Sequence, residues 1–201
     1  AAETARLGVG LNDNLPAETI SPDPKQPLVP NQDLTDAAVA HSLDMLQRDY
    51  FDHKNPEGET VVERARAEGY PTSYVGENIA WEGSTGTLDR DSQPARRYEW
   101  LFRSAPHRKN YLFDTYQDIG LGMRFGDFTD AGVTYDTAMV TQVFGRRSAD
   151  TSLVGTVFDD ANGNGTFDLR EGIAKATVQV GDRSVATNDA GGVPPSRARH
   201  S

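Results

Sequence analysis

The chain has 201 residues, of which 36% are hydrophobic and 25% are charged, a globular composition that suits one domain and a smaller piece. No run approaches 18 apolar residues, so we expect no transmembrane helix, and the absence of cysteine excludes disulfides and thiolate sites. The net charge of −10 argues against a nucleic-acid partner, because phosphate contacts need clustered lysine and arginine.

Helices dominate the first half of the predicted fold. A short helix, AAETARLG, opens the chain without a cap, which suggests that an earlier part has been cut away, and a proline-rich loop follows it. Residues 35–50 form the next predicted helix, with Thr35 as its cap. Its apolar side consists of Ala38, Leu43, Met45, Leu46 and Tyr50.

Two further helices are predicted. In residues 60–69, Thr60 and Glu63 form a capping box and Gly69 ends the helix. Residues 94–104 form a helix whose Trp100 we expect in the core, together with Trp81, whereas Arg96 and Arg97 should lie on a solvated face.

Strands follow the helices. DIGLGMRFGDF alternates apolar and other residues, and TYDTAMVTQVFG is rich in β-formers. Helices followed by strands predict an α+β domain in which helices cover an antiparallel sheet. We place this domain at residues 1–147 and expect a polar linker at 148–152, a partial β module at 153–190 and an unstructured tail at 191–201.

Residues 160–171, DANGNGTFDLRE, match a calcium loop at every position. Calcium prefers six to eight oxygen ligands, and the loop offers them in the order that the motif requires. The alternative is a plain Asn-Gly turn between strands. The predicted calcium ligands are Asp160, Asn162, Asn164, Thr166, Asp168 and Glu171.

Three polar residues of the first domain form a second candidate site. His53 follows the end of one helix, His107 lies at the end of another, and Glu77 is expected in a loop between those helices. Side chains carried by loops at helix ends can converge on one cavity. An imidazole near a carboxylate can bind a divalent metal or exchange protons, or the pair can simply hold a loop in place.

Other residues near this site are weaker candidates for a functional role. Ser104 and His107 are three residues apart and, with Glu77, suggest a nucleophile, a base and a third member, but Ser104 fits better as a helix cap. His41 is expected in the core or behind the site. Arg108 is expected to fix its loop by pairing with a carboxylate or with carbonyls.

The ordered motifs AHSLDMLQRDYFDHKNPEG, ERARAEGY, GENIAW, HRKNYL, DIGLGM and TQVFG resemble the bacterial branch of the CAP superfamily across residues 35–145. That superfamily comprises cysteine-rich secretory proteins, antigen 5 and plant pathogenesis-related proteins. The resemblance implies an α-β-α sandwich that is usually secreted. Its members have varied roles, including sterol and lipid binding, defence, toxicity and reported proteolysis.

The eukaryotic members of that family carry two histidines and two glutamates in one cavity. By this resemblance, His53 is the first histidine and Glu77 is the glutamate of the GEN motif. Arg103 stands where the second glutamate is expected, and Met139 lies near the place of the second histidine. His107 belongs to the bacterial S-x-x-H-R motif, here SAPHR. Half of the tetrad is therefore kept.

The second module also resembles a known family. The run VGTVFDDANGNGTFDLREGIAKATVQV is similar to the calcium-binding B-type repeats of bacterial surface adhesins, which are small β-sandwiches. The resemblance covers about residues 153–190, and a complete repeat would continue with further strands.

Three functions are consistent with these patterns. The first is a secreted, monomeric binding module for a small apolar or lipid-like ligand or for a cell-envelope component. The second is a metal-assisted hydrolase, for example a protease, in which zinc on His53 and His107 activates water and Glu77 acts as general base. The third is an adhesion protein that calcium stiffens and that performs no chemistry.

Overall fold

The computed structural model describes residues 2–146, 155–165, 167, 170–189 and 191–193. The chain divides into two compact units, Ala1–Ser148 and Ala149–Ser201. The predicted linker at 148–152 lies outside the described residues. None of the described helices combines the length and the hydropathy that a membrane crossing requires.

A four-stranded sheet forms the middle of the first unit, in the order β1-β3-β4-β2. The long strands β3 (Asp118–Asp130) and β4 (Val133–Gly145) form an antiparallel hairpin, as their β-forming sequences predict. The two-residue strand β1 (Val29–Pro30) runs parallel to β3 at one edge. Strand β2 (Val75–Ser84) pairs antiparallel with β4 and forms the other edge.

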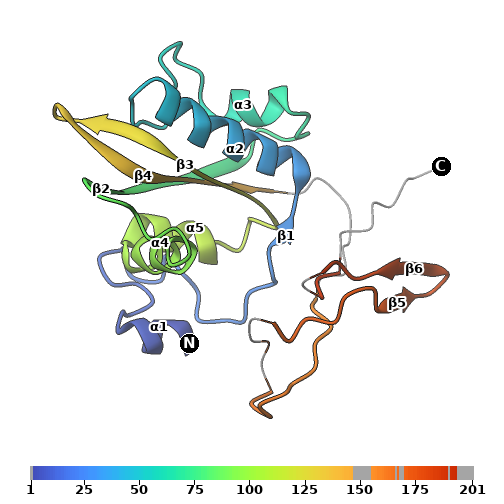
Figure 1. Ribbon diagram of the computed structural model, residues 1–201. Coiled ribbons are helices and arrows are strands. Elements are labelled where there is room, and N and C mark those ends of the chain that lie inside the picture. The colour runs from blue at the N-terminus through green and yellow to red at the C-terminus, as the bar shows by residue number, and fades with distance from the viewer. Residues whose placement is uncertain (1, 147–154, 166, 168–169, 190, 194–201) are drawn as a thin grey trace. The chain divides into compact units, whose positions relative to one another are not determined.

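Helices cover both faces of this sheet, which confirms the predicted α-β-α arrangement (Figure 1). On one face lie α2 (Gln32–Gln47) and α3 (Val61–Ala67). On the other face lie α4 (Gln93–Arg103) and α5 (Ala105–Leu112), and the short helix α1 (Ala2–Leu7) lies beyond them on that side.

Helix α2 packs directly on the backbone of the sheet because β3 carries glycines beneath it. A Cβ atom added to Gly120 would lie 2.1 Å from the backbone of Leu34, and one added to Gly122 would lie 2.4 Å from that of Ala38. Only glycine permits so close an approach. At these two positions, β3 therefore contacts the helix through its backbone rather than through side chains.

Two details of α2 differ from the prediction. The helix begins at Gln32, because the side chain of Asn31 accepts a hydrogen bond from the Leu34 amide and caps it one turn before Thr35. It ends at Gln47, so Tyr50 lies in the following loop. Leu43, assigned to the apolar side, is 41% exposed. For α3, the predicted capping box of Thr60 and Glu63 is confirmed.

The opposite face is built differently. The predicted helix at 94–104 is α4, and a second helix, α5, follows it at Ser104. Arg108 of α5 is completely buried, and its guanidinium donates hydrogen bonds to four backbone carbonyls, which confirms its predicted role in fixing loops. These carbonyls belong to Leu11, Asp13, Phe102 and Arg103.

Two side chains of α4 lie where the prediction did not place them. Trp100 is 51% exposed rather than in the core, and Arg97 is buried rather than solvated. Arg97 pairs with Glu82 and donates to the Trp81 carbonyl, so its charge is compensated inside the protein. Arg96 is exposed, as expected, and bonds the other oxygen of Glu82.

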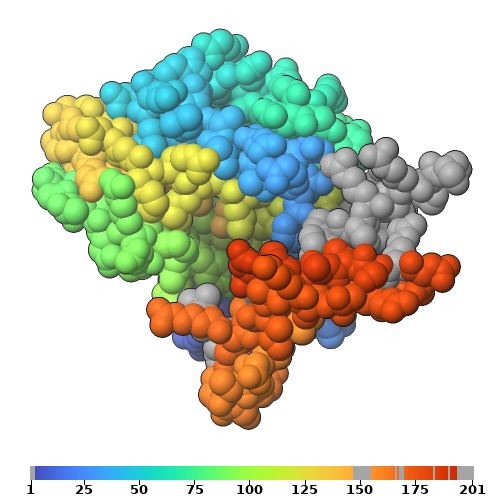
Figure 2. Space-filling view, turned by 45° about the vertical axis from the view of Figure 1, so that its right-hand side comes forward, coloured from blue at the N-terminus to red at the C-terminus, as the bar shows by residue number. Residues whose placement is uncertain are grey.

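Strand β2 is the longest element that the sequence did not reveal. Glu77 lies within it, paired with Val143 of β4, and not in a loop between helices. The far end of β2 pairs with β4 beside the β3–β4 hairpin, where the Leu88 amide bonds Asp136. The space-filling view shows the green segment that follows β2 against the yellow hairpin at that end of the unit (Figure 2).

The described residues of the second unit form one regular hairpin. Strands β5 (Thr177–Val180) and β6 (Arg183–Ala186) pair antiparallel, within the range predicted for the β module. Isolated bridges join Thr156 to Gly192 and Phe158 to Gly172. The described pairing thus extends to residue 193, three residues beyond the predicted end of the module, while residues 194–201 lie outside the described part.

Candidate functional site

A pocket of about 350 Å³ lies along the edge strand β2 of the first unit. We call it the edge pocket. Its walls come from the loop after α2, from β2 itself, and from α4 and α5. The lining residues are Phe51, Asp52, His53, Ile79, Ala80, Trp81, Trp100 and His107. Two of the three residues predicted for a site therefore line one cavity, and the third stands behind it.

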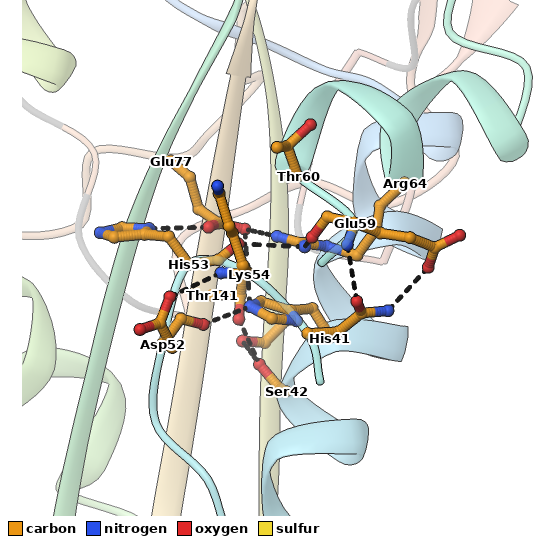
Figure 3. A network of polar contacts seen from close by, with 12 residues as sticks. His41, Ser42, Asp52, His53, Lys54, Glu59, Thr60, Arg64, Glu77 and Thr141 are labelled. Carbon is orange, nitrogen blue, oxygen red and sulfur yellow. Dashed lines mark hydrogen bonds and ion pairs between the residues drawn. The ribbon is translucent and has the colours of Figure 1, made fainter. Parts of the chain in front are cut away.

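Glu77 is that third residue, and its carboxylate is enclosed by hydrogen-bond donors from His53 and Arg64 (Figure 3). Its side chain is 2% exposed, its Oε1 lies 2.8 Å from Nδ1 of His53, and its Oε2 lies 2.6 Å from a guanidinium nitrogen of Arg64. A buried carboxylate needs such partners, because removal from water without them is costly. Both oxygens are occupied, so Glu77 acts on the pocket through His53.

The contact with Glu77 sets the chemistry of the His53 ring. Because a carboxylate accepts hydrogen bonds, Nδ1 carries the proton, and Nε2 of the neutral ring bears a lone pair. The side chain is 57% exposed, and no described residue bonds Nε2. The hydrogen bond to Glu77 raises the pKa of His53 above its ordinary value, although burial opposes it. The ring is thus a basic, oriented proton acceptor at the pocket wall.

Arg64 holds this arrangement together, and the sequence reasoning missed it. Besides the ion pair with Glu77, its guanidinium donates to the backbone carbonyls of His53 and Glu59. One side chain of α3 thereby fixes the carboxylate and the loop that carries the imidazole. The position of Arg64 on the predicted helix could be read from the sequence, because it directly follows the capping glutamate Glu63. No partner was predicted for its side chain.

His41 lies behind the network, as expected, and does not line the edge pocket. Its Nε2 is 3.0 Å from the Asp52 carbonyl and 4.0 Å from Glu77. The bond to a carbonyl places the proton on Nε2, and burial lowers the pKa of His41 despite the nearby carboxylate. His41 is therefore a neutral donor that ties the 51–53 loop to α2.

His107 forms part of the opposite wall. It lies in the first turn of α5, just after the end of α4, and its Nδ1 is 2.8 Å from Oγ of Ser104. Its ring lies 5.8 Å from that of Trp100. Burial, and secondarily His53, lowers the pKa of His107. The two imidazoles of the pocket therefore differ in character, with the more basic ring at His53.

The proposed triad of Ser104, His107 and Glu77 is not assembled. Ser104 does contact His107, and it stands at the predicted helix cap between α4 and α5, where its amide donates to the carbonyls of Trp100 and Leu101 while its side chain makes no cap hydrogen bond. Glu77, however, pairs with His53 on the α2 side of the sheet, so it cannot orient His107. Ser104 contacts His107, whereas Glu77 contacts His53.

Asn78, the residue after Glu77, joins β2 to α5 and was also missed. Its amide nitrogen donates to the His107 carbonyl at 3.3 Å, and its Oδ1 accepts from Asn110 at 2.8 Å. Neighbouring residues of a strand point to opposite faces of the sheet. Glu77 and Asn78 therefore position His53 from one face and His107 from the other.

The two remaining tetrad positions have structural roles here. Arg103 donates to the Leu7 carbonyl at 2.7 Å, and Met139 is fully buried beside Met45 and Phe128. Within the described part of the chain, no group of three His, Asp, Glu or Cys side chains is placed to hold a metal ion. His53 and His107 alone give two nitrogen ligands, one fewer than a catalytic zinc site uses.

The calcium loop is described only in part, because Thr166 and Asp168 lie outside the described residues. The Asp160 carboxylate accepts hydrogen bonds from the amides of Asn164 and Gly165. Gly165 has a φ of +73°, which suits the sharp turn of the motif. These oxygens and this turn fit a calcium loop, and its flanks are bridged in β fashion through Phe158 and Gly172 rather than helical.

Comparison with known proteins supports the resemblance of the first unit. Residues 21–144 match the cysteine-rich secretory protein family, CAP. The chain belongs to this family. Protein YkwD of Bacillus subtilis (strain 168) is 31% identical to the CAP chain over 97 residues, which cover 48% of this chain and 35% of that protein. The chain thus spans about a third of the length of this relative.

Two solved structures are similar to the CAP chain. One is an extracellular protein containing an SCP domain from Bacillus anthracis, with a TM-score of 0.48 and 27% identity over 61% of this chain and 35% of that chain. The other is an outer surface protein from Borrelia burgdorferi, with a TM-score of 0.46 and 14% identity over 62% of this chain and 80% of that chain.

Proposed function

We propose that the CAP unit is an extracellular binding module and that the edge pocket takes a small apolar or lipid-like ligand, or the corresponding part of a cell-envelope component. The observation that carries the proposal is the pocket's composition. Aromatic and aliphatic side chains form most of its lining, and Asp52 and two imidazoles on opposite walls supply the polar groups. Small-molecule sites combine such a lining with a few oriented polar groups.

The volume and the surroundings of the pocket support the same conclusion. About 350 Å³ falls within the range of small-ligand sites, roughly 300–1,000 Å³. Phe51 and Trp100 are 40% and 51% exposed, although aromatic rings usually bury most of their surface. An occupant of the pocket would cover both rings. Secretion agrees with the description of the family as secretory.

The test uses the two tryptophans of the chain, both of which line the pocket. Titration with the apolar fluorophore N-phenylnaphthylamine should quench Trp81 and Trp100 by energy transfer. Trp100→Ala should weaken binding by about tenfold, equivalent to about 1.4 kcal/mol. Leu121→Ala is the matched control, since Leu121 is 55% exposed and lies outside the pocket. Equal affinity in both variants would refute the proposal.

A metal-assisted hydrolase is the second candidate, and the Glu77–His53 pair favours it. Zinc held by His53 and His107 would activate water as a Lewis acid. Glu77 suits the role of base poorly, because both of its oxygens are engaged. His53 itself is the better proton acceptor. Casein hydrolysis that zinc stimulates and His53→Ala abolishes would support this candidate, and unchanged hydrolysis in that variant would refute it.

For the second unit we propose calcium binding by the loop at 160–171, as in an adhesin-like module that calcium stiffens. The described oxygens of Asp160 and the turn at Gly165 support it. Isothermal titration with calcium should give one site that Asp160→Ala removes. Retained binding in that variant would mean that calcium binds outside this loop. Asp182→Ala, outside the loop, is the control.

A further inference from the structure

We propose that the ligand of the edge pocket is an extended peptide segment, which adds to the free edge of β2 and exchanges backbone hydrogen bonds with Ile79. This inference rests on the proposed function, because it takes the edge pocket as the binding site. Peptides that add a strand to an exposed sheet edge gain affinity from main-chain bonds and specificity from alternate side chains.

The pocket touches the backbone of β2 itself. Ile79, Ala80 and Trp81 are consecutive residues, and all three line the pocket. Because neighbouring side chains of a strand point to opposite faces of the sheet, side chains alone cannot form such a wall. The pocket must lie against the edge of the strand, where the backbone amides and carbonyls are presented.

The hydrogen-bond pattern of the sheet shows which β2 groups face this edge. The Ile119 carbonyl bonds β1, so the next residue, Gly120, bonds its partner Val143 on β4. Val143 is thereby turned toward β3, and Gln142 is turned toward Asn78 of β2. Because residues along β2 alternate in this way, the amides and carbonyls of Glu77, Ile79 and Trp81 point away from β4.

Side chains from α4 and α5 confirm this direction and occupy two of the three outward carbonyls. Asn110 donates to the Glu77 carbonyl at 3.3 Å, and Arg97 donates to the Trp81 carbonyl at 3.1 Å. Between them, neither the amide nor the carbonyl of Ile79 has a partner among the residues that the structure describes. Of the three outward residues, Ile79 is therefore the one whose carbonyl is also free, and it lies at the pocket.

Burial makes this free pair significant. Ile79 is only 5% exposed, so its outward backbone groups see little solvent except through the pocket. Buried backbone groups in proteins are almost always paired. One donor and one acceptor on the same residue match the amide and carbonyl of a single residue in an extended peptide. A sugar would stack on Trp100, but its structure does not place a hydrogen-bond donor and an acceptor at the spacing of a β-strand.

The walls then supply places for the side chains of such a peptide. An added strand sends alternate side chains to the two faces of the sheet. One side chain would meet Phe51 and His53 on the α2 side, and the next would meet Trp100 and His107 on the α4 side. Each place has an aromatic ring and one imidazole, and Asp52 adds a carboxylate on the α2 side, so mainly apolar peptides are the expected class.

The experiment follows the Ile79 amide by NMR in the full chain labelled with ¹⁵N. The probe is a mixed pool of blocked hexapeptides of apolar residues. The control is the same pool methylated on its two central backbone nitrogens, which removes the donors and leaves the side chains. The unmethylated pool should shift the Ile79 amide and slow its hydrogen exchange, and the methylated pool should bind at least about tenfold more weakly.

Several results would overturn the proposal. An Ile79 amide that does not respond, or equal binding of the two pools, would exclude strand addition. A response to chitohexaose without a response to peptides would assign the pocket to sugars. N-phenylnaphthylamine in the same samples distinguishes failure of the peptide proposal from failure of the proposed function. If it binds and the peptides do not, only the peptide proposal fails, whereas if neither binds the edge pocket itself is not a binding site.

Discussion

The two faces of the CAP sheet are held by different means. On the α2–α3 face, the helix backbone rests on glycines of β3, and charged groups meet at Glu77 beneath it. On the α4–α5 face, two buried arginines, Arg97 and Arg108, bond carbonyls, and aromatic rings fill the space. The first face fixes His53 through an ionised network, and the second carries His107 on a helix that neutral amides hold. The pocket therefore has one wall that a charged network holds from behind and one apolar, exposed wall.

Removal of the carboxylate should affect the first face most. Glu77→Ala leaves Arg64 buried without its ion pair and should lower the free energy of unfolding by about 3–5 kcal/mol. Urea denaturation followed by circular dichroism measures this change. Glu57→Ala is the control, because the Glu57 pair with Arg48 is exposed and should contribute less than about 1 kcal/mol. Equal effects would mean that the network does not hold this face.

The close approach of α2 to β3 gives the next largest effect. Gly120→Ala would place a Cβ 2.1 Å from the helix backbone and should cost about 3 kcal/mol, because backbone atoms cannot move aside cheaply. Thermal unfolding reports the loss. Gly126→Ala on the same strand meets only the end of Leu46 at 3.5 Å and should be nearly neutral. A tolerated alanine at Gly120 would show that the two layers are further apart.

The second face depends on Arg108. Arg108→Met keeps most of the volume but leaves four carbonyls without their donor, so a loss of about 2–3 kcal/mol is expected. Arg103→Met is the matched control, since Arg103 donates to a single carbonyl. The ratio of the two losses in the same denaturation experiment tests whether Arg108 anchors this face. Comparable losses would contradict that role.

The smallest predicted effect concerns the two imidazoles. By NMR titration, His53 should have a pKa above its ordinary value and His107 one below it. The stabilising contribution of His53 is complete below its unfolded pKa and is lost as the pH rises through its folded pKa. That of His107 is complete above its unfolded pKa and is lost as the pH falls through its folded pKa. Glu77→Gln should lower the pKa of His53 and leave that of His107 nearly unchanged.

Local signals in the sequence were enough for several features. The capping box at Thr60 and the alternation in β3 predicted their elements, and the expectation that Arg108 bonds carbonyls to fix its loop is confirmed. Strand β2 was missed because a charged and an amide residue, Glu77 and Asn78, interrupt its apolar pattern. Both are buried only through partners on other elements, which no local rule identifies.

The site could be predicted only as a set of residues. His53 and His107 were selected from their places near helices, and both line the edge pocket. The role of Arg64 and the free edge at Ile79 arise from pairings between elements far apart in the chain. Trp100 was assigned to the core because aromatic residues on a helix usually pack inward, whereas here it borders the pocket.

The most direct test of the edge pocket as a binding site is to follow the ring protons of the histidines while N-phenylnaphthylamine is added. The account predicts that the signals of His53 and His107 shift together along one binding curve, and that the signal of His41, which lies behind Glu77, stays in place. Unchanged signals of His53 and His107 at saturating probe would contradict it.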